Sequence, residues 1–398
     1  MKILFIAWDG PQVQYLRSLF IPIFVRLQEF GYEFHVLHCT WGAVDDQDVE
    51  ACVRAGIGFS RMRVLRGPSV AVGATLSVIH LSKVILSVAR DYAVDVLMPR
   101  STLPVMGAML ANRRLGLPLV FDADGLPLDE RVDFGGRSSS SIMQRVLRDM
   151  EAEAVRLADR VLTRSNAATR VLIARAGAGV DTSKFHLITN GRCEETYRPA
   201  SEERINHWRV ANDIAMDAPC VMCVGSMGQQ YRLDRVFRFF QFLKARRHDA
   251  RLTICTGDPC EASRLLVESE CAVGGIEIRR VPAEQIPATL ALADVGLAFR
   301  QPSFSMQGVA PIKLGEYLLC GLPVVCSTGV GDTDAVKKAA RLVDGFEDFE
   351  LDASAEWVVE QVMPHRRLWR EKARDVGVRH FSLEATVTAY RQALAEVR

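Results

Sequence analysis

The sequence predicts an α/β protein of two doubly wound domains, each built on a parallel β-sheet with helices on both faces. Short and almost continuously apolar runs alternate with helical patterns along the chain, as expected of strands buried on both faces. The chain has 398 residues, and chains longer than about 250–300 residues usually divide into domains. Its hydrophobic content of 49% and charged content of 24% are those of a globular protein.

We expect the first domain to span residues 1–198 and the second to span 199–381. The boundary is placed at Pro199, in a polar stretch that follows a turn at Asn190. A final amphipathic helix is expected over residues 382–398. Two such sheets imply two Rossmann-like domains, whose ligands bind at the carboxyl ends of the strands. The expected strands are 2–8, 33–39, 58–64, 95–100, 119–124, 160–164 and 185–189, followed by 220–225, 252–256, 276–281, 295–299, 323–326 and 341–343.

The segment 311–320 is predicted to be a short helix with an unusual distribution of charge. Pro311 suits its first position, and Lys313 lies in the first turn, where the helix dipole favours an anion by about 0.3–1 kcal/mol. Glu316 follows on the same face and offers an acceptor for hydroxyl groups. Gly315 costs about 1 kcal/mol in a helix interior, which predicts the close approach of another backbone or a ligand. The pattern therefore suits a nucleotide sugar, although an ordinary surface Lys–Glu pair has the same spacing.

The charge and cysteine content exclude several classes of function. With 49 basic and 48 acidic residues the formal net charge is +1, so no global basic field indicates nucleic acid. The ten cysteines lie scattered in apolar contexts, which is typical of reduced, buried thiols. Cys220 and Cys223 fall on opposite faces of one predicted strand, so a zinc site is not expected there. The chain starts directly with a strand and shows no signal-peptide pattern, which predicts a cytoplasmic protein.

The longest apolar stretch, 70–88, raises the question of membrane contact. It contains Lys83, whose charge would cost about 2.5–3.5 kcal/mol at the centre of a membrane-spanning helix. We therefore expect a buried helix packed on the sheet. The preceding residues Arg61, Arg63 and Arg66 would each contribute about 1 kcal/mol near an anionic surface. Weak, salt-sensitive peripheral contact with a membrane is the resulting hypothesis.

Three strand ends of the first domain carry groups suited to a ligand. Gly10 permits an anion to approach a helix N-terminus, although a simple tight turn explains it equally well. The loop lacks the G-x-G-x-x-G pattern, which counts against a nicotinamide-dinucleotide enzyme. Arg100 ends one strand, and Asp122 and Asp124 lie on one face at the end of another. The Gly/Ser-rich loop 135–141 is either a mobile cover or a plain surface loop.

In the second domain, a strand, a glycine-bearing loop and a helix start together outline a phosphate site. The residues at this point are Gly225, Ser226 and, at the helix start, Arg232. The next two strands end at the same edge of the sheet, in Thr256 and in Val281 and Pro282.

The C-terminal part resembles the signature of GT-B glycosyltransferases, specifically the large retaining family 4-like group of bacterial polysaccharide and capsule synthesis. The resembling segments are 302–305, 311–317, 320–325 and 329–334. The resemblance implies transfer of a sugar from a nucleotide-diphosphate sugar, with UDP favoured over GDP, to a glycan or lipid-linked acceptor. It also implies retention of configuration, no metal or other cofactor, a cleft between the domains, and a terminal helix that crosses back to the first domain.

The resemblance also assigns roles to individual residues. Glu316 would hold the ribose, and Lys313 would face the donor. Arg232 would neutralise the diphosphate in place of the family's usual Arg and Lys, whose positions hold Ser226 and Tyr231. Residues at the other strand ends complete the donor site: Gly10, Gly225, Ser226, Thr256, Val281 and Pro282. The candidate catalytic residues are Arg232, Lys313 and Asp124, and the acceptor side comprises Arg100, Asp122, Asp124 and Glu130.

Two departures from the family pattern keep other functions open. Gly308 stands where many members have a glutamate that contacts the donor sugar, and Asp124 stands where relatives often have arginine. A nucleotide-sugar epimerase or hydrolase on the same fold is one alternative. A non-catalytic protein that binds nucleotide sugars is the other.

Overall fold

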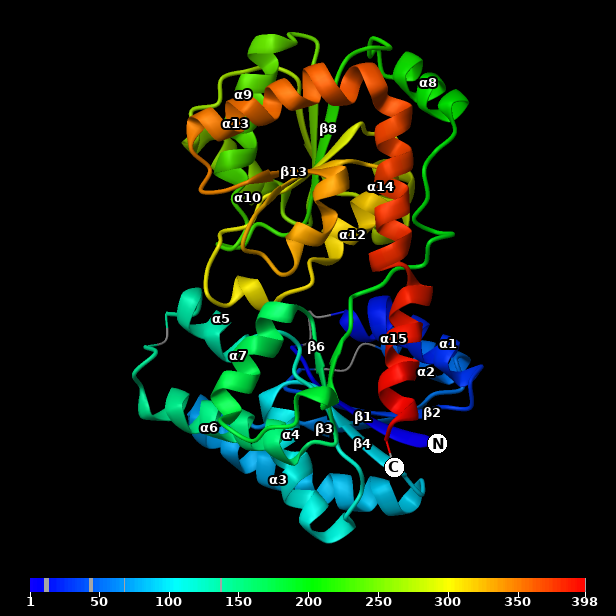
Figure 1. Cartoon of the computed structure of the whole chain (residues 1–398), viewed down its shortest axis with the longest axis vertical. Helices are drawn as coiled ribbons and strands as arrows, with labels where there is room; N and C mark the ends of the chain where they lie inside the picture. Colours follow the sequence, from blue (N-terminus) through cyan, green and yellow to red (C-terminus); the bar gives the residue numbers. More distant parts are fainter. Residues whose placement is uncertain (11–13, 43–45, 68, 137, 398) are drawn as a thin grey trace. The chain divides into compact units, whose positions relative to one another are not determined.

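The computed structural model describes residues 1–10, 14–42, 46–67, 69–136 and 138–397. The chain divides into two compact units, unit 1 with Met1–Thr189 and Thr386–Arg398, and unit 2 with Asn190–Ala385 (Figure 1). All thirteen predicted strands are present, and each end lies within two residues of its expected position. Residues 11–13, which follow Gly10, and Arg137 of the Gly/Ser-rich loop 135–141 lie outside the described residues.

Unit 1 contains a parallel sheet with the order β3-β2-β1-β4. Isolated parallel bridges, Leu97 to Leu119 and Arg100 to Asp122, link β4 to a second parallel sheet with the order β5-β6-β7. The strands are β1 (Lys2–Trp8), β2 (Glu33–Thr40), β3 (Gly58–Arg63), β4 (Val96–Pro99), β5 (Val120–Asp122), β6 (Arg160–Thr163) and β7 (Phe185–Leu187). The helices are α1 (Ile21–Gln28), α2 (Asp46–Arg54), α3 (Val70–Asp91), α4 (Thr102–Leu115), α5 (Pro127–Asp133), α6 (Ile142–Leu157) and α7 (Asn166–Ala176), with a π-helical turn at Leu16–Phe20 and a 3₁₀ turn at Thr182–Lys184.

Unit 2 contains one parallel sheet with the order β10-β9-β8-β11-β12-β13. Its strands are β8 (Cys220–Val224), β9 (Arg251–Cys255), β10 (Ile276–Arg279), β11 (Val295–Ala298), β12 (Val324–Ser327) and β13 (Ala340–Val343). The helices are α8 (Glu202–Ala211), α9 (Leu233–Arg246), α10 (Pro259–Glu268), α11 (Ile286–Leu290), α12 (Ile312–Leu319), α13 (Asp348–Trp357), α14 (Arg366–Phe381) and α15 (Leu383–Ala395), the last of which continues into unit 1. Shorter helical turns lie at Ala283–Gln285, Met306–Gly308, Thr333–Ala339, Val358–Val362 and Met363–His365.

The boundary between the units lies at Asn190 instead of Pro199, because the intervening segment is bonded to unit 2. The Asn190 side-chain amide donates to the carbonyl of Ala310 at 2.9 Å. Arg192 pairs with the returning chain at Ser382 through an isolated parallel bridge. The chain re-enters unit 1 at Thr386, four residues later than the expected 382.

Gly315 is explained by the same returning segment. A Cβ at this position would lie 2.8 Å from Cβ of Phe381, closer than carbon atoms normally approach. The predicted close neighbour is therefore present, and it is an aromatic side chain of α14.

Helix α3 is a surface helix, so the prediction of a buried helix was wrong. Among the described residues it is the one helix long and apolar enough to cross a membrane, but only 28% of its most apolar stretch is buried. Its buried face includes Leu81 and Ile85, and Leu81 packs against Gly107 of α4. Val70, Val72, Leu76 and Ile79 are exposed. The helix contacts α4 along one side and leaves the other side of an apolar sequence uncovered.

Candidate active site

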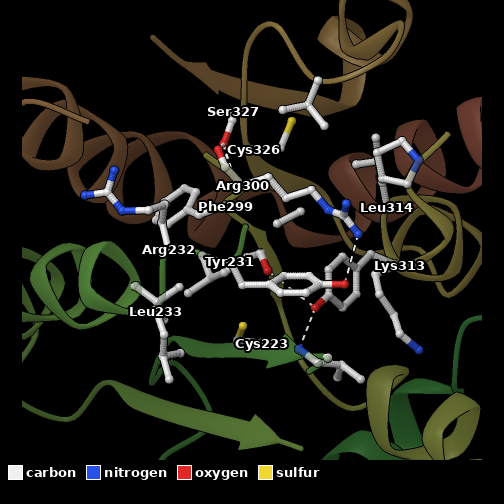
Figure 2. A pocket seen from close by; sticks show the side chains of 18 of the residues that line it. Cys223, Tyr231, Arg232, Leu233, Phe299, Arg300, Lys313, Leu314, Cys326 and Ser327 are labelled. Carbon is white, nitrogen blue, oxygen red and sulfur yellow. Dashed lines mark hydrogen bonds between the residues drawn. The ribbon is translucent and has the colours of Figure 1, made fainter. Parts of the chain in front are cut away.

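A cavity in unit 2 lies at the carboxyl edge of the sheet, beside the point where the strand order reverses between β8 and β11 (Figure 2). Ligands of open parallel sheets bind at this kind of position. Gly225 and Ser226 line the cavity after β8, Arg300 lines it after β11, and Lys313 lines it from α12. Because α9 and α12 both begin at the cavity wall, their free N–H groups and dipoles favour an anion there.

The cavity is nearly closed in this conformation. Its volume, taken for the centre of a water-sized sphere, is about 40 Å³, which leaves room for a few water molecules. Figure 2 shows the ring of Tyr231 lying across it, with the Arg300 guanidinium beside the ring's hydroxyl. Gly225 has a φ of 156°, and a Cβ at this position would lie 3.7 Å from Cε1 of the Tyr231 ring. A ligand of nucleotide size therefore requires the side chain of Tyr231 to move.

Arg232 lines the cavity, but its guanidinium is already paired. It donates to both carboxylate oxygens of Asp234, at 2.9 and 2.8 Å, and to the side-chain oxygen of Gln301 at 2.5 Å. It also lies 5.3 Å from the ring centroid of Phe346. The hydrogen bonds with Asp234 raise the pKa of Arg232. The predicted role of Arg232 on the diphosphate remains a prediction, and its charge is locally balanced.

Arg300 is a residue of the cavity that the sequence analysis missed. Its guanidinium lies 4.7 Å from the ring centroid of Tyr231 and donates to the hydroxyl of Tyr231 at 3.0 Å. The available signal was its position, since Arg300 follows a predicted strand almost directly and charged residues at such strand ends face ligands.

Lys313 and Glu316 form the ion pair that their spacing suggests, at 2.9 Å. Lys313 is partly exposed and lines the cavity, whereas the Glu316 side chain is 0% exposed and is not one of the lining residues. The other carboxylate oxygen of Glu316 accepts from Nε of Arg192 and from the hydroxyl of Tyr197, both at 3.0 Å. Burial, and next the negative charge of Glu316, raise the pKa of Tyr197. The ribose role of Glu316 stays a prediction, and in this conformation its carboxylate is fully engaged within unit 2.

The remaining predicted donor residues lie outside the lining of this cavity. Thr256 is buried after β9, and its hydroxyl accepts from the backbone N–H of Asp258 at 3.1 Å. Val281 is half-buried and Pro282 is exposed after β10. Gly10 follows β1 in unit 1 and is buried there.

In unit 1, the predicted residues Arg100, Asp122 and Asp124 come together at the carboxyl edge of the sheets. Arg100 pairs with Asp124 at 2.5 Å and with Asp9 at 3.3 Å. Burial alone would lower the pKa of Arg100, but the neighbouring carboxylates, Asp124 first among them, outweigh it and raise the pKa. Arg164 was missed and completes the cluster from the end of β6, pairing with Asp122 at 2.7 Å.

The Asp122–Arg164 pair is almost inaccessible to water, with side-chain exposures of 0% and 3%. Burial raises the pKa of Asp122, and the positive charge of Arg164 opposes that rise. For Arg164, burial would lower the pKa, and Asp122 reverses the effect to a net increase. Each partner therefore depends on the other for its charged state.

Backbone strain marks the same edge of unit 1. Ser101 and Asp124 have φ values of 73° and 52°, which non-glycine residues rarely adopt. Such conformations cost on the order of 1–3 kcal/mol and concentrate at functional sites. Each lies two residues after the end of a strand, β4 or β5, where the charged cluster is located, so the strain accompanies the placement of these side chains.

Glu130 does not share the burial of this cluster. It is exposed on α5, whereas the adjacent Asp129 is buried and pairs with Arg148 and Arg175, both at 2.7 Å. The acceptor role of Glu130 remains a prediction.

Within the described ranges, no group of three or more histidine, cysteine, aspartate or glutamate residues is arranged to hold a metal ion. The carboxylates of Asp122 and Asp124 each face a guanidinium. The ten cysteines form no disulfides.

Two family models match the chain in succession. Residues 23–191 match the glycosyl transferase 4-like domain, and residues 218–355 match the glycosyl transferases group 1. The two matches fall in unit 1 and unit 2, with the first ending two residues beyond the boundary.

Known proteins with similar sequences and structures agree with these models. A GDP-mannose-dependent alpha-(1-6)-phosphatidylinositol monomannoside mannosyltransferase of Mycolicibacterium smegmatis is 29% identical over 175 residues, which cover 42% of this chain and 44% of that protein. Anabaena HepE in complex with UDP has a TM-score of 0.74 at 16% identity, over 100% of both chains. A glycosyltransferase from Rickettsia africae has a TM-score of 0.71 at 15% identity, over 99% of this chain and 98% of that one. The chain belongs to the family 4-like glycosyltransferases of the GT-B fold.

Proposed function

We propose that this protein transfers a sugar from a nucleoside-diphosphate sugar to a glycan or lipid-linked acceptor, with retention of configuration. The observation that carries the proposal is the cavity of unit 2, where Lys313, Arg300 and the first turns of α9 and α12 converge beside the switch point of the sheet. Positive charge and free N–H groups at one point suit a diphosphate.

The chemistry that this arrangement supports is stabilisation of a leaving group. The bond between the anomeric carbon and the diphosphate oxygen breaks, and its electron pair stays on the diphosphate. The acceptor oxygen bonds to the anomeric carbon, and its proton passes to the diphosphate oxygen. Cations fixed around the diphosphate lower the energy of the developing charge without reorganisation. Lys313 is the proposed catalytic cation, while the catalytic roles of Arg232 and Asp124 remain predictions.

For the donor, we propose a UDP-sugar ahead of a GDP-sugar. The similarity to HepE with bound UDP supports this choice, whereas the mycobacterial relative uses GDP-mannose. Both nucleotides therefore belong in the test. We also propose that no metal or other cofactor is needed, because guanidinium groups already balance Asp122 and Asp124.

We propose a cytoplasmic protein that contacts the anionic inner face of the cytoplasmic membrane through α3 and the end of β3. The exposed apolar side chains of α3, such as Leu76 and Ile79, lie on the same helix as exposed Lys83. The preceding basic residues Arg61, Arg63 and Arg66 are exposed as well. Each would contribute about 1 kcal/mol near an anionic surface.

The membrane contact is tested by sedimentation with vesicles. At low salt, wild type should pellet with anionic vesicles and stay in solution with neutral ones, and reversal of the three arginine charges should release it. Leu76→Ser with Ile79→Ser should weaken binding without altering its salt dependence. Failure of wild type to pellet at low salt rules out this contact.

The transfer reaction is tested with a panel of UDP- and GDP-sugars, each with and without lipid-linked and free glycan acceptors. Release of free nucleoside diphosphate only in the presence of an acceptor is the expected result. An epimerised nucleotide sugar without acceptor would replace the proposal with an epimerase. Binding of nucleotide sugar with no turnover under any condition would indicate a binding protein.

A further inference from the structure

Arg300 is anchored by its own backbone at the switch point of the unit 2 sheet. Its N–H donates to the hydroxyl oxygen of Ser327 at 2.8 Å, and that hydroxyl donates to the Arg300 carbonyl at 2.8 Å. Ser327 is the last residue of β12, so the Arg300 backbone is fixed to two strands of the sheet. The segment of Tyr231 is itself paired with this strand end through an isolated antiparallel bridge, in which the N–H of Gln301 donates to the carbonyl of Gln230 at 2.9 Å.

The guanidinium of Arg300 has no acidic partner among the residues that the structure describes. Its contacts are the ring and hydroxyl of Tyr231 and, at 3.6 Å, the sulfur of Met306. Arg300 is half-buried. A cation withdrawn from water gains most from an opposite charge, and the neighbours described here supply only a ring face and neutral acceptors.

The two arginines of the cavity wall therefore differ in kind. Arg232 is held by Asp234 and Gln301 and points away from Tyr231 and Lys313 in Figure 2. Arg300 reaches toward the side of the cavity where Lys313 lies (Figure 2). The charge of Arg232 is balanced by Asp234, whereas the charge of Arg300 is available to an anionic ligand.

We propose that Arg300, whose backbone is anchored by Ser327, binds the diphosphate of the donor and stabilises its developing charge as the glycosidic bond breaks. The inference rests on the proposed function and names the residue that serves its leaving group. When the bond breaks, the electron pair moves onto the diphosphate oxygen, and the planar guanidinium is suited to bind two oxygens at once. The Tyr231 ring lies across the cavity and must rotate aside to admit the donor, while the Ser327 hydrogen bonds and the bridge at Tyr231 hold the Arg300 backbone in place.

The test compares Arg300→Met with Arg232→Met, which removes the same charge from the same cavity wall. Arg238→Met is the matched control, because Arg238 is exposed on α9 and pairs with Asp348 outside the cavity. Calorimetry measures binding of UDP and GDP beside uridine and guanosine, and steady-state assays give kcat and KM. Melting temperatures establish that each variant is folded.

Arg300→Met should lower kcat about 100- to 1000-fold, as loss of an oxyanion-hole donor does. It should also weaken binding of the diphosphate at least tenfold while binding of the nucleoside is unchanged. Arg300→Lys should recover part of both effects, and it replaces the Met variant if that variant does not fold. Arg232→Met should have the smaller effect, and Arg238→Met should match wild type.

Two results would overturn the inference while the proposed function stands. One is a loss in Arg232→Met equal to or larger than that in Arg300→Met. The other is equal weakening of nucleoside and nucleoside-diphosphate binding in Arg300→Met, which would show a general disturbance of the site. Wild type that binds no nucleoside diphosphate and turns over no nucleotide sugar would remove the proposed function itself, and the inference with it.

Discussion

Replacement of Glu316 by glutamine should lower the thermal stability of unit 2, whether or not it weakens binding of the donor. Glu316 is 0% exposed and its two oxygens serve three donors, from Lys313, Arg192 and Tyr197. Glutamine keeps one acceptor oxygen, but its amide group would face the N–H of Arg192 or the ammonium of Lys313. The guanidinium of Arg192 then loses its negatively charged partner.

The magnitude follows from these contacts. Hydrogen bonds to charged groups contribute about 1.5–3 kcal/mol each, and breaking a buried ion pair costs about 3–5 kcal/mol. Because Arg192 and Lys313 are 14% and 34% exposed and can recover some hydration, we expect about 2–3 kcal/mol. For a unit of this size that corresponds to a fall in Tm of about 4–12 °C.

The assay is thermal unfolding of wild type and Glu316→Gln, combined with calorimetric binding of UDP and GDP well below both transitions. The ribose role that the family resemblance gives to Glu316 predicts instead a loss of donor affinity with an unchanged Tm. The structure predicts a lower Tm whether or not affinity falls. A Tm equal to that of wild type, together with weaker nucleotide binding, would refute the structural role and show that the carboxylate is reserved for the ribose.

Three further variants test Lys313 of the cavity and two buried charged groups of unit 1. Lys313→Met should raise the activation free energy by ~2.7–4 kcal/mol, as loss of an oxyanion-hole donor does, and leave Tm nearly unchanged, since Glu316 keeps Arg192 and Tyr197; measurements of kcat and Tm on one preparation check this. Arg164→Met should destabilise unit 1 by about 3–5 kcal/mol, because Asp122 is left buried without its partner, and denaturant titration would contradict this if the midpoint stayed in place. Burial, opposed by Arg175, raises the pKa of Glu151 from 4.5 to about 6. Between these two pH values the native state keeps a proton that the unfolded chain has lost. The free energy of unfolding therefore falls by about 2 kcal/mol as the pH rises from below 4.5 to above 6. Unfolding of Glu151→Gln between pH 4 and 7 should lack this slope, and an identical pH dependence in both proteins would show that Glu151 titrates normally.

The strands could be predicted because their signal is local. A strand buried on both faces must be apolar at almost every position, and turn residues mark its ends, so composition over five or six residues is sufficient. Helix α3 shows the limit of the same signal. Its sequence is as apolar as that of a buried helix, and only the packing against α4 reveals that one side is uncovered.

Site residues could be predicted where their position follows from the strand that carries them. Features that depend on contacts with residues far away in the sequence were missed. Arg100, Asp122 and Asp124 were identified from strand ends, and the structure brings them together. The burial of Glu316 depends on Arg192 and Tyr197, which precede it by 124 and 119 residues. No spacing rule links such residues.

Arg232 and Arg300 show the same limit for charge. Both are arginines at the rim of one cavity, and the sequence gives no basis for ranking them. The difference arises from Asp234, which lies two residues from Arg232 and engages it, while Arg300 meets a tyrosine ring. Whether an arginine can bind an anionic ligand therefore depends on the residues that surround it in the fold.

The carboxyl edges of the sheets in the two units differ in their charge balance. In unit 1, Asp9, Asp122 and Asp124 face Arg100 and Arg164, so the cluster is nearly neutral and its charges are mutually engaged. In unit 2, Lys313 pairs with Glu316, which also serves Arg192, and Arg300 has no acidic partner among the described residues, so the cavity keeps an excess of positive charge. A doubly charged diphosphate is attracted to the second environment and gains little from the first. The charge distribution therefore supports the proposal that the donor diphosphate binds in unit 2, and the acceptor role of unit 1 remains a prediction.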